Sequence, residues 1–389
     1  MNAFRIISKP ELVFGANASL TVGEKLKKYG CTKVICIYDK GVKSTGSVDK
    51  IVKAIESEGI DVVHFDGVLP DPPDTVVNAA GELGRNEKVN GIVAIGGGSA
   101  IDTAKGVNIL LSNPGNILQY GINTVYNNSR TPMIMIPTTA GTGSETTNMG
   151  VITSTREDRK VIIYGEGCVA NMAILDPALT IGLPPYPTAA TGMDVLAHAA
   201  EALTSKRNWN EYSAIFAEKA ISMVVKYLPI AVADGSNMEA RENMLLAAHY
   251  GGIAFTDVTV HVAHGIGHSM GAKFHVPHGT ACAIPLPSVM RLISTTDKEG
   301  VRRVGNAMGL NLDAELSAEE IGNAVAIAIF ELGRKVGIPT MQELNIGRDD
   351  FADIADLTIM DTTYFYYPTK VSKRAILALL EESYVRGEK

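Results

Sequence analysis

The stretch GIVAIGGGSAIDTAKGVNILLS, residues 91–112, contains an apolar run, a glycine-rich turn and a helical pattern in direct succession. Residues 91–95 are typical of a buried strand, and residues 99–111 are typical of a helix. The same alternation recurs along the chain, with strands predicted at 33–38, 60–65, 132–136 and 172–175 and helices at 17–29, 47–58 and 74–87. It predicts a parallel sheet that is covered by helices on both faces.

The character of the sequence changes at a proline-rich segment, Leu183-Pro184-Pro185-Tyr186-Pro187. Beyond this segment strand signals largely disappear, and helical patterns dominate at roughly 188–204, 210–234, 238–256, 259–272, 318–336 and 370–386. A chain of 389 residues corresponds to two or three domains of ordinary size. We therefore predict an α/β domain over residues 1–183 and an all-α domain over residues 184–389.

Composition and charge exclude several classes of function. Apolar residues make up 46% of the chain and charged residues 20%, which is too apolar for a disordered protein. Acidic residues outnumber basic residues by 42 to 35, so we expect no binding to nucleic acid or to a membrane. Four scattered cysteines, with no apolar leader segment and no membrane-spanning run, predict a cytoplasmic protein with reduced thiols.

The turn Gly96-Gly97-Gly98-Ser99-Ala100-Ile101-Asp102 has the properties of a phosphate-binding site. Glycines allow the backbone to come close to a phosphate, and the following helix begins with free N–H groups and the positive end of its dipole. The dinucleotide fingerprint GxGxxG is absent from this turn, so a tight turn without a ligand is the alternative interpretation.

A second loop rich in glycine and hydroxyl groups, Pro137–Thr147, also follows a predicted strand. Because parallel strands present their carboxyl ends at one edge of a sheet, both loops are expected there, where they would bind a dinucleotide. Asp39 follows another strand, where its carboxylate would accept hydrogen bonds from ribose hydroxyls and repel a 2′-phosphate. Lys160 is a further candidate for a ribose or phosphate contact, with an ordinary surface role as the alternative for both residues.

Six of the eight histidines fall between residues 249 and 278. Upstream of them, Asp194 and His198 are four residues apart in a predicted helix and therefore share one face. The same spacing recurs at His264 and His268, and His278 follows in the loop-like segment VPHG. Three imidazoles and one carboxylate drawn from this set would suit Fe²⁺ or Zn²⁺. Buried structural histidines and a surface ion pair are the alternative.

Together these segments carry a recognisable resemblance. The chain resembles the iron-containing (group III) alcohol dehydrogenases, a family that includes lactaldehyde reductases, 1,3-propanediol dehydrogenases and methanol dehydrogenases. The motifs are YDKG at 38–41, GGGSAID at 96–102, PTTAGTGSE at 137–145, TAATGMDVLAHAAEA at 188–202 and the segment from GIAF to VPHG at 252–279. The resemblance implies a dehydroquinate-synthase-like fold, with an α/β nucleotide-binding domain, an all-α metal-binding domain and an active site in the cleft between them.

The resemblance also implies roles for individual residues. The metal ligands would be Asp194, His198, His264 and His278. His268 would lie beside the metal as a catalytic residue, for proton relay or substrate positioning. The dinucleotide, NAD(H), would be lined by Asp39, Asp71, Gly97, Gly98, Ser99, Asp102, Thr138, Thr139, Thr142 and Lys160. Fe²⁺ is the expected metal and Zn²⁺ the alternative, in a homodimer or larger homo-oligomer.

Two departures from the family pattern concern ligand contacts. Asp71 stands where many relatives have Asn, beside the expected cofactor. The segment at 256–263 carries additional polar residues, which we interpret as facing a hydroxylated or anionic short aldehyde; they are Asp257, Thr259 and His261.

The sequence therefore predicts a metal-dependent, NAD(H)-linked alcohol dehydrogenase or aldehyde reductase that acts on a small primary alcohol or a short, polar aldehyde. One alternative is a metal- and NAD-dependent lyase or cyclase resembling dehydroquinate synthase, which acts on a phosphorylated sugar acid. The scarcity of Lys and Arg in MDVLAHAA and VAHGIGHSMGA argues against it. A non-catalytic protein of the same fold is a second alternative, disfavoured by the complete set of ligands and by both glycine-rich loops.

Overall fold

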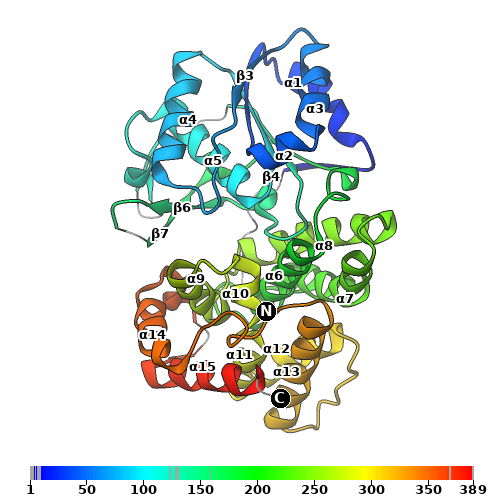
Figure 1. Cartoon of the computed structure of the whole chain (residues 1–389), viewed down its shortest axis with the longest axis vertical. Helices are drawn as coiled ribbons and strands as arrows, with labels where there is room; N and C mark the ends of the chain where they lie inside the picture. The colour runs from blue at the N-terminus through cyan, green and yellow to red at the C-terminus, as the bar shows by residue number, and fades with distance from the viewer. Residues whose placement is uncertain are drawn as a thin grey trace. The chain divides into compact units, whose positions relative to one another are not determined.

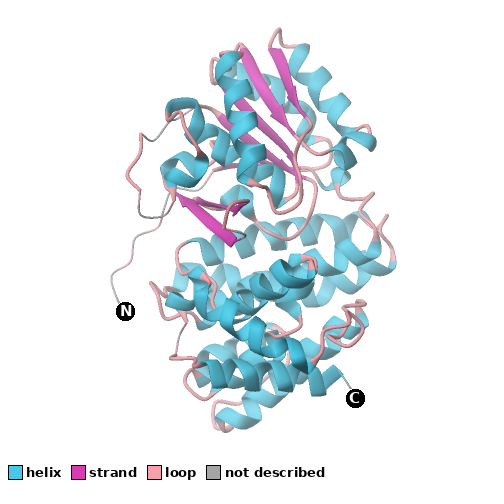
Figure 2. Ribbon diagram, turned by 60° about the vertical axis from the view of Figure 1, so that its left-hand side comes forward, coloured by secondary structure: helices cyan, strands magenta, loops and turns pink. Residues whose placement is uncertain are grey.

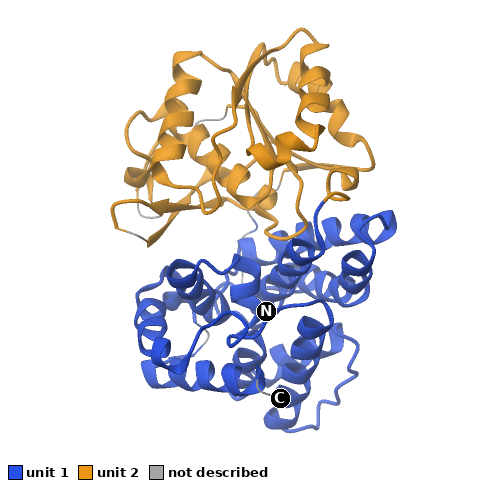
Figure 3. Ribbon diagram, viewed as in Figure 1, with its two compact units in different colours: residues 1–6, 183–389 blue, residues 7–182 orange. Residues whose placement is uncertain are grey.

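The computed structural model describes residues 4, 6, 10–121, 124–127, 131–157, 159–367 and 369–387. The chain divides into two compact units, one formed by residues 7–182 and the other by residues 1–6 and 183–389 (Figure 3). The division therefore falls at the start of the proline-rich segment. Among the described residues, no helix combines the length and the apolar character needed to cross a membrane.

The unit of residues 7–182 is built on a six-stranded sheet in which all neighbouring strands run parallel (Figure 1). Its strand order is β1-β8-β5-β4-β2-β3. The strands are β1 (Glu11–Phe14), β2 (Lys33–Ile37), β3 (Asp61–Phe65), β4 (Gly91–Gly96), β5 (Met133–Pro137) and β8 (Met172–Leu175). All of them except β1 match predicted strands, and the predicted parallel sheet is confirmed.

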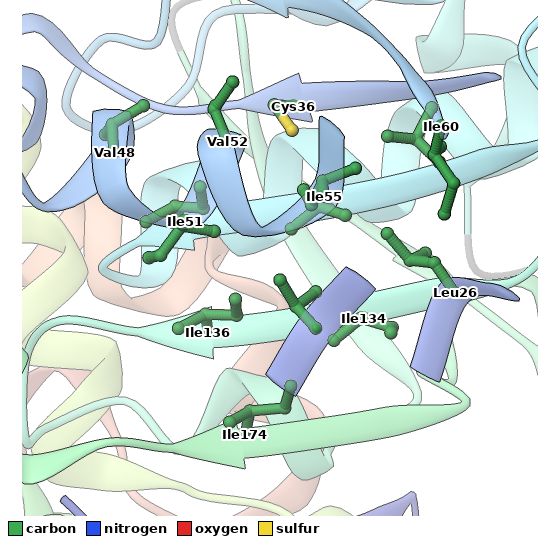
Figure 4. Close-up of a cluster of buried hydrophobic side chains, with 14 of the residues drawn as sticks. Leu26, Cys36, Val48, Ile51, Val52, Ile55, Ile60, Ile134, Ile136 and Ile174 are labelled. Carbon is green, nitrogen blue, oxygen red and sulfur yellow. The ribbon is translucent and has the colours of Figure 1, made fainter. Parts of the chain in front are cut away.

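Helices pack on both faces of this sheet, which explains why its strands are apolar along their whole length. They are α1 (Val22–Lys28), α2 (Lys40–Ser44), α3 (Ser47–Glu56), α4 (Asp74–Asn86) and α5 (Gly98–Ser112). Side chains alternate along each strand, so Cys36 packs with α1 and α3 (Figure 4), whereas Ile35 and Ile37 pack with α4 and α5. Ile51 and Ile55 of α3 are fully buried in the first of these clusters. Each contributes roughly 1.5–3 kcal/mol of transfer free energy.

The direction of winding reverses at β2, because β3 lies on one side of β2 and β4 lies on the other. In open parallel sheets such a switch point leaves a crevice at the carboxyl ends of the two diverging strands, where ligands bind. Asp39 follows β2 at this edge, and the glycine turn follows β4. The fold thus brings together two of the segments that the sequence singles out for nucleotide binding.

Two elements of this unit are not among the predicted ones. The edge strand β1 has only four residues, mostly exposed, so no buried apolar run marks it in the sequence. A hairpin of β6 (Met149–Ser154) and β7 (Arg159–Tyr164) forms a separate antiparallel sheet. Its strands carry many half-buried residues, a pattern too mixed for a prediction from apolar runs.

The described residues of the unit that contains 183–389 form helices and loops without a strand (Figure 2). The α-helices are α6 (Pro185–Thr204), α7 (Glu211–Ala233), α8 (Met238–Thr256), α9 (Val262–Phe274), α10 (His278–Ala283), α11 (Leu286–Ser294), α12 (Lys298–Ala307), α13 (Ala318–Lys335), α14 (Phe351–Met360) and α15 (Lys373–Gly387). The all-α class is confirmed. Helix α6 is buried along most of its length and packs against α7, α8, α9 and α10.

One local prediction in this unit is wrong. The segment VPHG was expected to be a loop, but His278 is the first residue of α10. The physical reason lies in Pro277, whose φ of −52° and extended ψ of 133° suit the residue that precedes a helix. His278 is therefore positioned by a helix and not by a free loop.

Candidate metal centre and nucleotide loops

Four side chains from three helices converge in the helical unit. They are Asp194 and His198 of α6, His264 of α9 and His278 at the start of α10. Their potential ligand atoms all lie within 4.8 Å of one another. The first three are buried, whereas the side chain of His278 is 37% exposed. These are the residues that the family resemblance implies as metal ligands.

The helical spacing of α6 explains one half of this cluster, because residues four apart lie one turn apart on the same face. The ring of His198 is held in a stack between two other rings. Its centroid lies 4.3 Å from that of Phe255 and 4.6 Å from that of His264. The stack restricts His198 to one orientation and joins α6 to α8 and α9.

The other half of the cluster depends on a close contact between α10 and α6. At Gly279 a Cβ atom would lie 2.0 Å from the carbonyl oxygen of Ala190, so only glycine fits there. This approach brings His278 Nε2 to 3.7 Å from Asp194 Oδ1. Any larger residue at position 279 would push α10 away and separate His278 from the other three side chains.

Three atoms that face the centre of the cluster have no hydrogen-bond partner in the part of the chain that the structure describes. Asp194 Oδ1, His198 Nδ1 and His264 Nε2 are buried and accept or donate no hydrogen bond. Each such unsatisfied group costs about 1–3 kcal/mol, which a native structure avoids unless a ligand pairs with it. One carboxylate and three imidazoles form a donor set suited to Fe²⁺ or Zn²⁺, so the residues present fit a divalent metal.

Burial also governs the protonation of this cluster. Burial raises the pKa of Asp194 to about 6, although His264 and His268 oppose the shift. Burial also lowers the pKa of His198 well below its ordinary value, and the nearby His264 adds to the effect. His198 is therefore held in the neutral form that a metal requires, and Asp194, with a pKa of about 6, is mostly ionised at neutral pH.

His268 lies next to the cluster but is not one of its four members. Its ring stacks on that of His278 with centroids 5.4 Å apart. Its Nδ1 lies 3.0 Å from Oδ2 of Asp361, whose other oxygen accepts hydrogen bonds from the N–H and hydroxyl groups of Thr363. Asp361 is a residue that sequence reasoning missed, because 93 residues separate it from His268 and no local pattern marks it.

A second residue missed from the sequence is Glu201, a fully buried carboxylate on α6. Its Oε2 lies 2.6 Å from His264 Nδ1, on the side of the ring opposite the metal cluster. Burial alone raises the pKa of Glu201, but contacts with His261 and His264 together hold that pKa well below its ordinary value. Its spacing of three residues from His198, in an otherwise apolar stretch, is the signal that could have identified it.

The polar segment before α9 does not face a substrate as interpreted from the sequence. His261 is fully buried, with Nε2 3.0 Å from Thr204 Oγ1 and Nδ1 3.1 Å from Glu201 Oε1. Asp257 is buried as well, and Thr259 has a φ of 69°, which is uncommon for a β-branched residue. The interpretation of His261 as a substrate-facing residue is wrong, because both its ring nitrogens are directed at protein atoms.

In the α/β unit, the glycine turn and the hydroxyl-rich loop contact each other at the carboxyl edge of the sheet. Helix α5 begins after Gly97 without a side-chain cap, which leaves its N-terminus available to an anion. A Cβ atom on Gly98 would lie 2.8 Å from Cγ2 of Thr142, so glycine is needed for the two loops to meet. Thr139 and Ser99 are half-buried at the same edge, and Thr138 is buried.

Other polar residues here are paired within the protein. Asp102 accepts hydrogen bonds from Ser144 Oγ, at 2.6 Å, and from the N–H of Val151, at 3.0 Å. The fully buried Lys105 donates to Ser144 Oγ and Thr147 Oγ1, both at 2.7 Å. Asp102 was predicted to line the cofactor, but its two oxygens hold the hydroxyl-rich loop and the hairpin.

Two further residues that were predicted to line the cofactor contact each other. Lys160 of β7 forms an ion pair with Asp71, which lies in the turn before α4. Asp71 is exposed and has a φ of 50°, a left-handed conformation that Asp tolerates. Asp39 also has a structural contact, since its Oδ1 caps α2 by accepting from the N–H of Val42 at 2.9 Å.

A nucleotide-type parallel sheet and a cluster of three imidazoles and one carboxylate, in one chain, are typical of oxidoreductases that use a dinucleotide and a metal. Comparison with known proteins narrows this class. The family model for iron-containing alcohol dehydrogenase matches residues 9–177, and the model for the C-terminal part of the Fe-containing alcohol dehydrogenase family matches residues 188–384. The chain belongs to the iron-containing alcohol dehydrogenase family and is an alcohol oxidoreductase.

Individual relatives agree with this assignment. The 1,3-propanediol dehydrogenase of Citrobacter freundii is 37% identical over 375 residues, which cover 95% of this chain and 96% of that protein. A 1,3-propanediol oxidoreductase of known crystal structure aligns with a TM-score of 0.92 at 35% identity, over 98% of this chain and 100% of the other. The sulfoacetaldehyde reductase of Bifidobacterium kashiwanohense, solved with NAD⁺, aligns with a TM-score of 0.87 at 28% identity, over 98% and 99% of the two chains.

These comparisons confirm the predicted family, the dehydroquinate-synthase-like fold class and the alcohol dehydrogenase class of activity. The predicted use of a metal and of NAD agrees with the description of the family and with the NAD⁺ complex of the reductase. Family membership favours the dehydrogenase over the sugar-acid lyase that the sequence left open.

Proposed function

We propose that this chain interconverts a small primary alcohol and the corresponding short aldehyde, using NAD(H) and one divalent metal ion, with Fe²⁺ as the expected metal and Zn²⁺ as the alternative. The observation that carries the proposal is the cluster of Asp194, His198, His264 and His278, in which three buried ligand atoms lack a protein partner. When bound, the metal supplies Lewis acidity toward the substrate oxygen, and NAD(H) supplies the hydride acceptor or donor.

The proton is proposed to pass through His268. Because the carboxylate of Asp361 can only accept a hydrogen bond, it holds the proton of the His268 ring on Nδ1. This leaves Nε2 as the nitrogen that takes a proton from an alcohol or returns one to the product of aldehyde reduction. The stacking of His268 on His278 supports a position beside the metal ligands.

The dinucleotide is proposed to bind at the carboxyl edge of the sheet. The uncapped start of α5 supports a diphosphate site at Gly97, Gly98 and Ser99, flanked by the hydroxyl groups of Thr138, Thr139 and Thr142. The carboxylate of Asp39, after β2, supports NAD(H) over NADP(H). Lys160 and Asp71 would contact the cofactor as an ion pair, and Asp102 would act through the loop that it holds.

Substrate, assembly and location are further parts of the proposal. Propanediol and sulfoacetaldehyde, in the names of the relatives, are short and polar, which supports a short polar aldehyde as the substrate here. The open edge of β1 exposes Leu12 and Phe14 by 40% each, which supports a homodimer or larger homo-oligomer. All four cysteines are buried and free, in keeping with a cytoplasmic location.

The test is consumption of NADH with a panel of short aldehydes that pairs polar members, such as glycolaldehyde and 3-hydroxypropanal, with apolar propanal and butanal. Protein treated with a chelator is resupplied with Fe²⁺, Zn²⁺ or no metal. We expect turnover only after metal is restored, with higher kcat/KM for the polar members. Turnover that is unchanged in the metal-free protein would contradict the metal proposal, and a preference for butanal would contradict the polar substrate.

A further inference from the structure

Glu201 of α6 makes several polar contacts with residues at the start of another helix, α9. It is fully buried, and each of its oxygens meets a backbone donor at the start of α9. Oε2 accepts from the N–H of His261 at 2.9 Å, and Oε1 accepts from the N–H of Ala263 at 2.6 Å. Oε2 also lies 2.6 Å from Nδ1 of His264. The carboxylate therefore links α6 to α9 through the backbone and through one metal-cluster side chain.

The two backbone donors fix the direction of the contact with His264. Each oxygen of Glu201 has two nitrogen neighbours, a backbone N–H and the Nδ1 atom of His261 or His264. The backbone N–H groups can only donate, which favours the ionised carboxylate as the acceptor of all four contacts. The short contact to His264 must then be a hydrogen bond donated by Nδ1–H of the ring. In the neutral ring that a metal requires, Nε2 then carries the lone pair, and Nε2 is the buried atom of His264 that makes no hydrogen bond and faces Asp194 Oδ1 at 3.7 Å.

We propose that Glu201 is a positioning residue of the metal centre, which holds His264 in the one tautomer and orientation that present a lone pair to the metal. The proposal rests on the proposed function only in requiring a metal among the four clustered side chains. Carboxylates in this role commonly change metal affinity by about 10–100-fold when they are replaced.

A purely structural role is the competing explanation. The N-cap residue of α9, His261, makes no side-chain capping hydrogen bond. The carboxylate of Glu201, which lies on α6, accepts from the backbone at this end of α9 and therefore also caps the helix. Loss of this cap would lower stability without changing the affinity for a metal in the protein that remains folded. Metal affinity therefore separates the two roles, whereas stability does not.

The substitution Glu201→Gln tests the tautomer directly. If the amide oxygen faces Ala263, the amide NH₂ opposes the N–H of His261 and faces His264 Nδ1, which must then accept and leave the proton on Nε2. If the amide is turned the other way, its NH₂ group opposes the N–H of Ala263 and disrupts the start of α9. In both cases His264 loses the arrangement that favours a metal.

A matched control is available in the other unit. Asp176 is also buried, and its carboxylate accepts from the N–H groups of Asn17, Ser19 and Ala178 and from the Ser19 hydroxyl, none of which belongs to the metal cluster. Asp176→Asn therefore removes a comparable set of hydrogen bonds without touching a metal ligand. Thr204→Val is the second variant, since it removes the contact between Thr204 and His261 and a hydrogen bond to the Ala200 carbonyl but leaves the carboxylate of Glu201 in place.

The experiment titrates Zn²⁺ into the metal-free protein against a chromogenic chelator and records the visible absorption spectrum of the Co²⁺-loaded protein. We expect Glu201→Gln to weaken Zn²⁺ binding by about 10–100-fold and to alter the Co²⁺ spectrum, whereas Asp176→Asn and Thr204→Val change the affinity by less than about threefold.

If Glu201→Gln binds Zn²⁺ with an affinity within twofold of that of the parent protein, the proposal is overturned. Glu201 is then only a helix cap, whatever the change in the free energy of unfolding. An equal loss of affinity in Thr204→Val would also overturn it, because affinity would then follow general packing between α6 and α9. A parent protein that binds no metal would overturn the metal centre itself. Failure of the proposed function alone would instead give a metal-loaded protein that binds Zn²⁺ normally and consumes no NADH.

Discussion

The metal cluster and the nucleotide loops differ in how they treat their polar atoms. In the cluster, Asp194 Oδ1, His198 Nδ1 and His264 Nε2 are buried without a partner. In the nucleotide region, several charged side chains are paired within the protein, as Asp102 is with Ser144 and Lys160 is with Asp71. The first region is proposed to need a cation to complete it, whereas the second has the backbone groups at the start of α5 and several threonine hydroxyls left to bind a ligand. Side-chain substitutions should therefore act directly in the first region and through loop conformation in the second.

The largest effect is expected from removing one member of the cluster. His264→Ala deletes one of the four proposed ligands, and the loss of several kcal/mol of charge stabilisation would correspond to a fall in kcat of about 1,000-fold. The metal content of the purified protein should fall with it. His275→Asn is the matched control, since it lies in the same segment, outside the cluster, at a positive φ of 55° that Asn tolerates. Full metal occupancy in His264→Ala would contradict the proposal that His264 is a metal ligand.

Lys105→Met should produce the largest effect in the nucleotide region, through stability. The fully buried ammonium group donates to Ser144 and Thr147. Its loss leaves these two hydroxyl groups without that donor and removes the positive charge that lies 3.6 Å from Asp102. We expect a free energy of unfolding lower by about 3 kcal/mol and a higher KM for NADH, measured by urea denaturation and steady-state kinetics. Lys33→Met, which removes an exposed ion pair with Glu87, should cost less than about 1 kcal/mol. Equal free energies of unfolding for Lys105→Met and Lys33→Met would contradict the proposal that Lys105 stabilises the hydroxyl-rich loop.

Asp361→Asn should have an intermediate effect that is confined to proton transfer. Without the carboxylate, His268 is no longer held with its proton on Nδ1, so we expect kcat to fall by about tenfold. KM and metal content should be unchanged, because His268 lies outside the four-residue cluster. Thr363→Ala, which leaves the carboxylate in place, is the control and should change kcat by less than about threefold. Metal loss in Asp361→Asn would place His268 among the ligands instead.

The smallest effect is expected at Asp39. Its contact with the dinucleotide is proposed, whereas its hydrogen bond from the N–H of Val42 is present in the structure. Asp39→Gly should raise kcat/KM for NADPH relative to NADH by about tenfold, because the charge that repels a 2′-phosphate is gone. Asp39→Asn removes the charge but keeps the hydrogen bond to Val42 that caps α2. Both variants should shift the cofactor preference equally. Unchanged preference in both would leave Asp39 as a helix cap only.

Sequence reasoning predicted the parts of this protein that depend on local spacing. The apolar runs of the parallel sheet, the glycine turn after β4 and the one-turn spacing of Asp194 and His198 are properties of short segments. Their periodicity follows directly from strand and helix geometry. The two strands of the hairpin, β6 and β7, were missed for the same reason, since their residues do not separate cleanly into apolar and polar positions.

The contacts that position the catalytic groups could not be predicted in this way. Glu201 meets His264 across 63 residues, and Asp361 meets His268 across 93. These contacts exist only after α6, α9 and the segment that follows α14 have packed together. The prediction of His264, and not His268, as a ligand likewise required the family resemblance, because the two residues lie one turn apart on α9.

The distribution of the four clustered residues over α6, α9 and α10 has a consequence for the life of the protein in a cell. The first and last of them, Asp194 and His278, come from helices that a bound cation would tie together. By mass action, metal at a hundred times its dissociation constant would add about 2.7 kcal/mol to the free energy of unfolding. A cell that runs short of iron would therefore hold less of this enzyme as well as less active enzyme, because the metal-free chain would open more often and be degraded sooner.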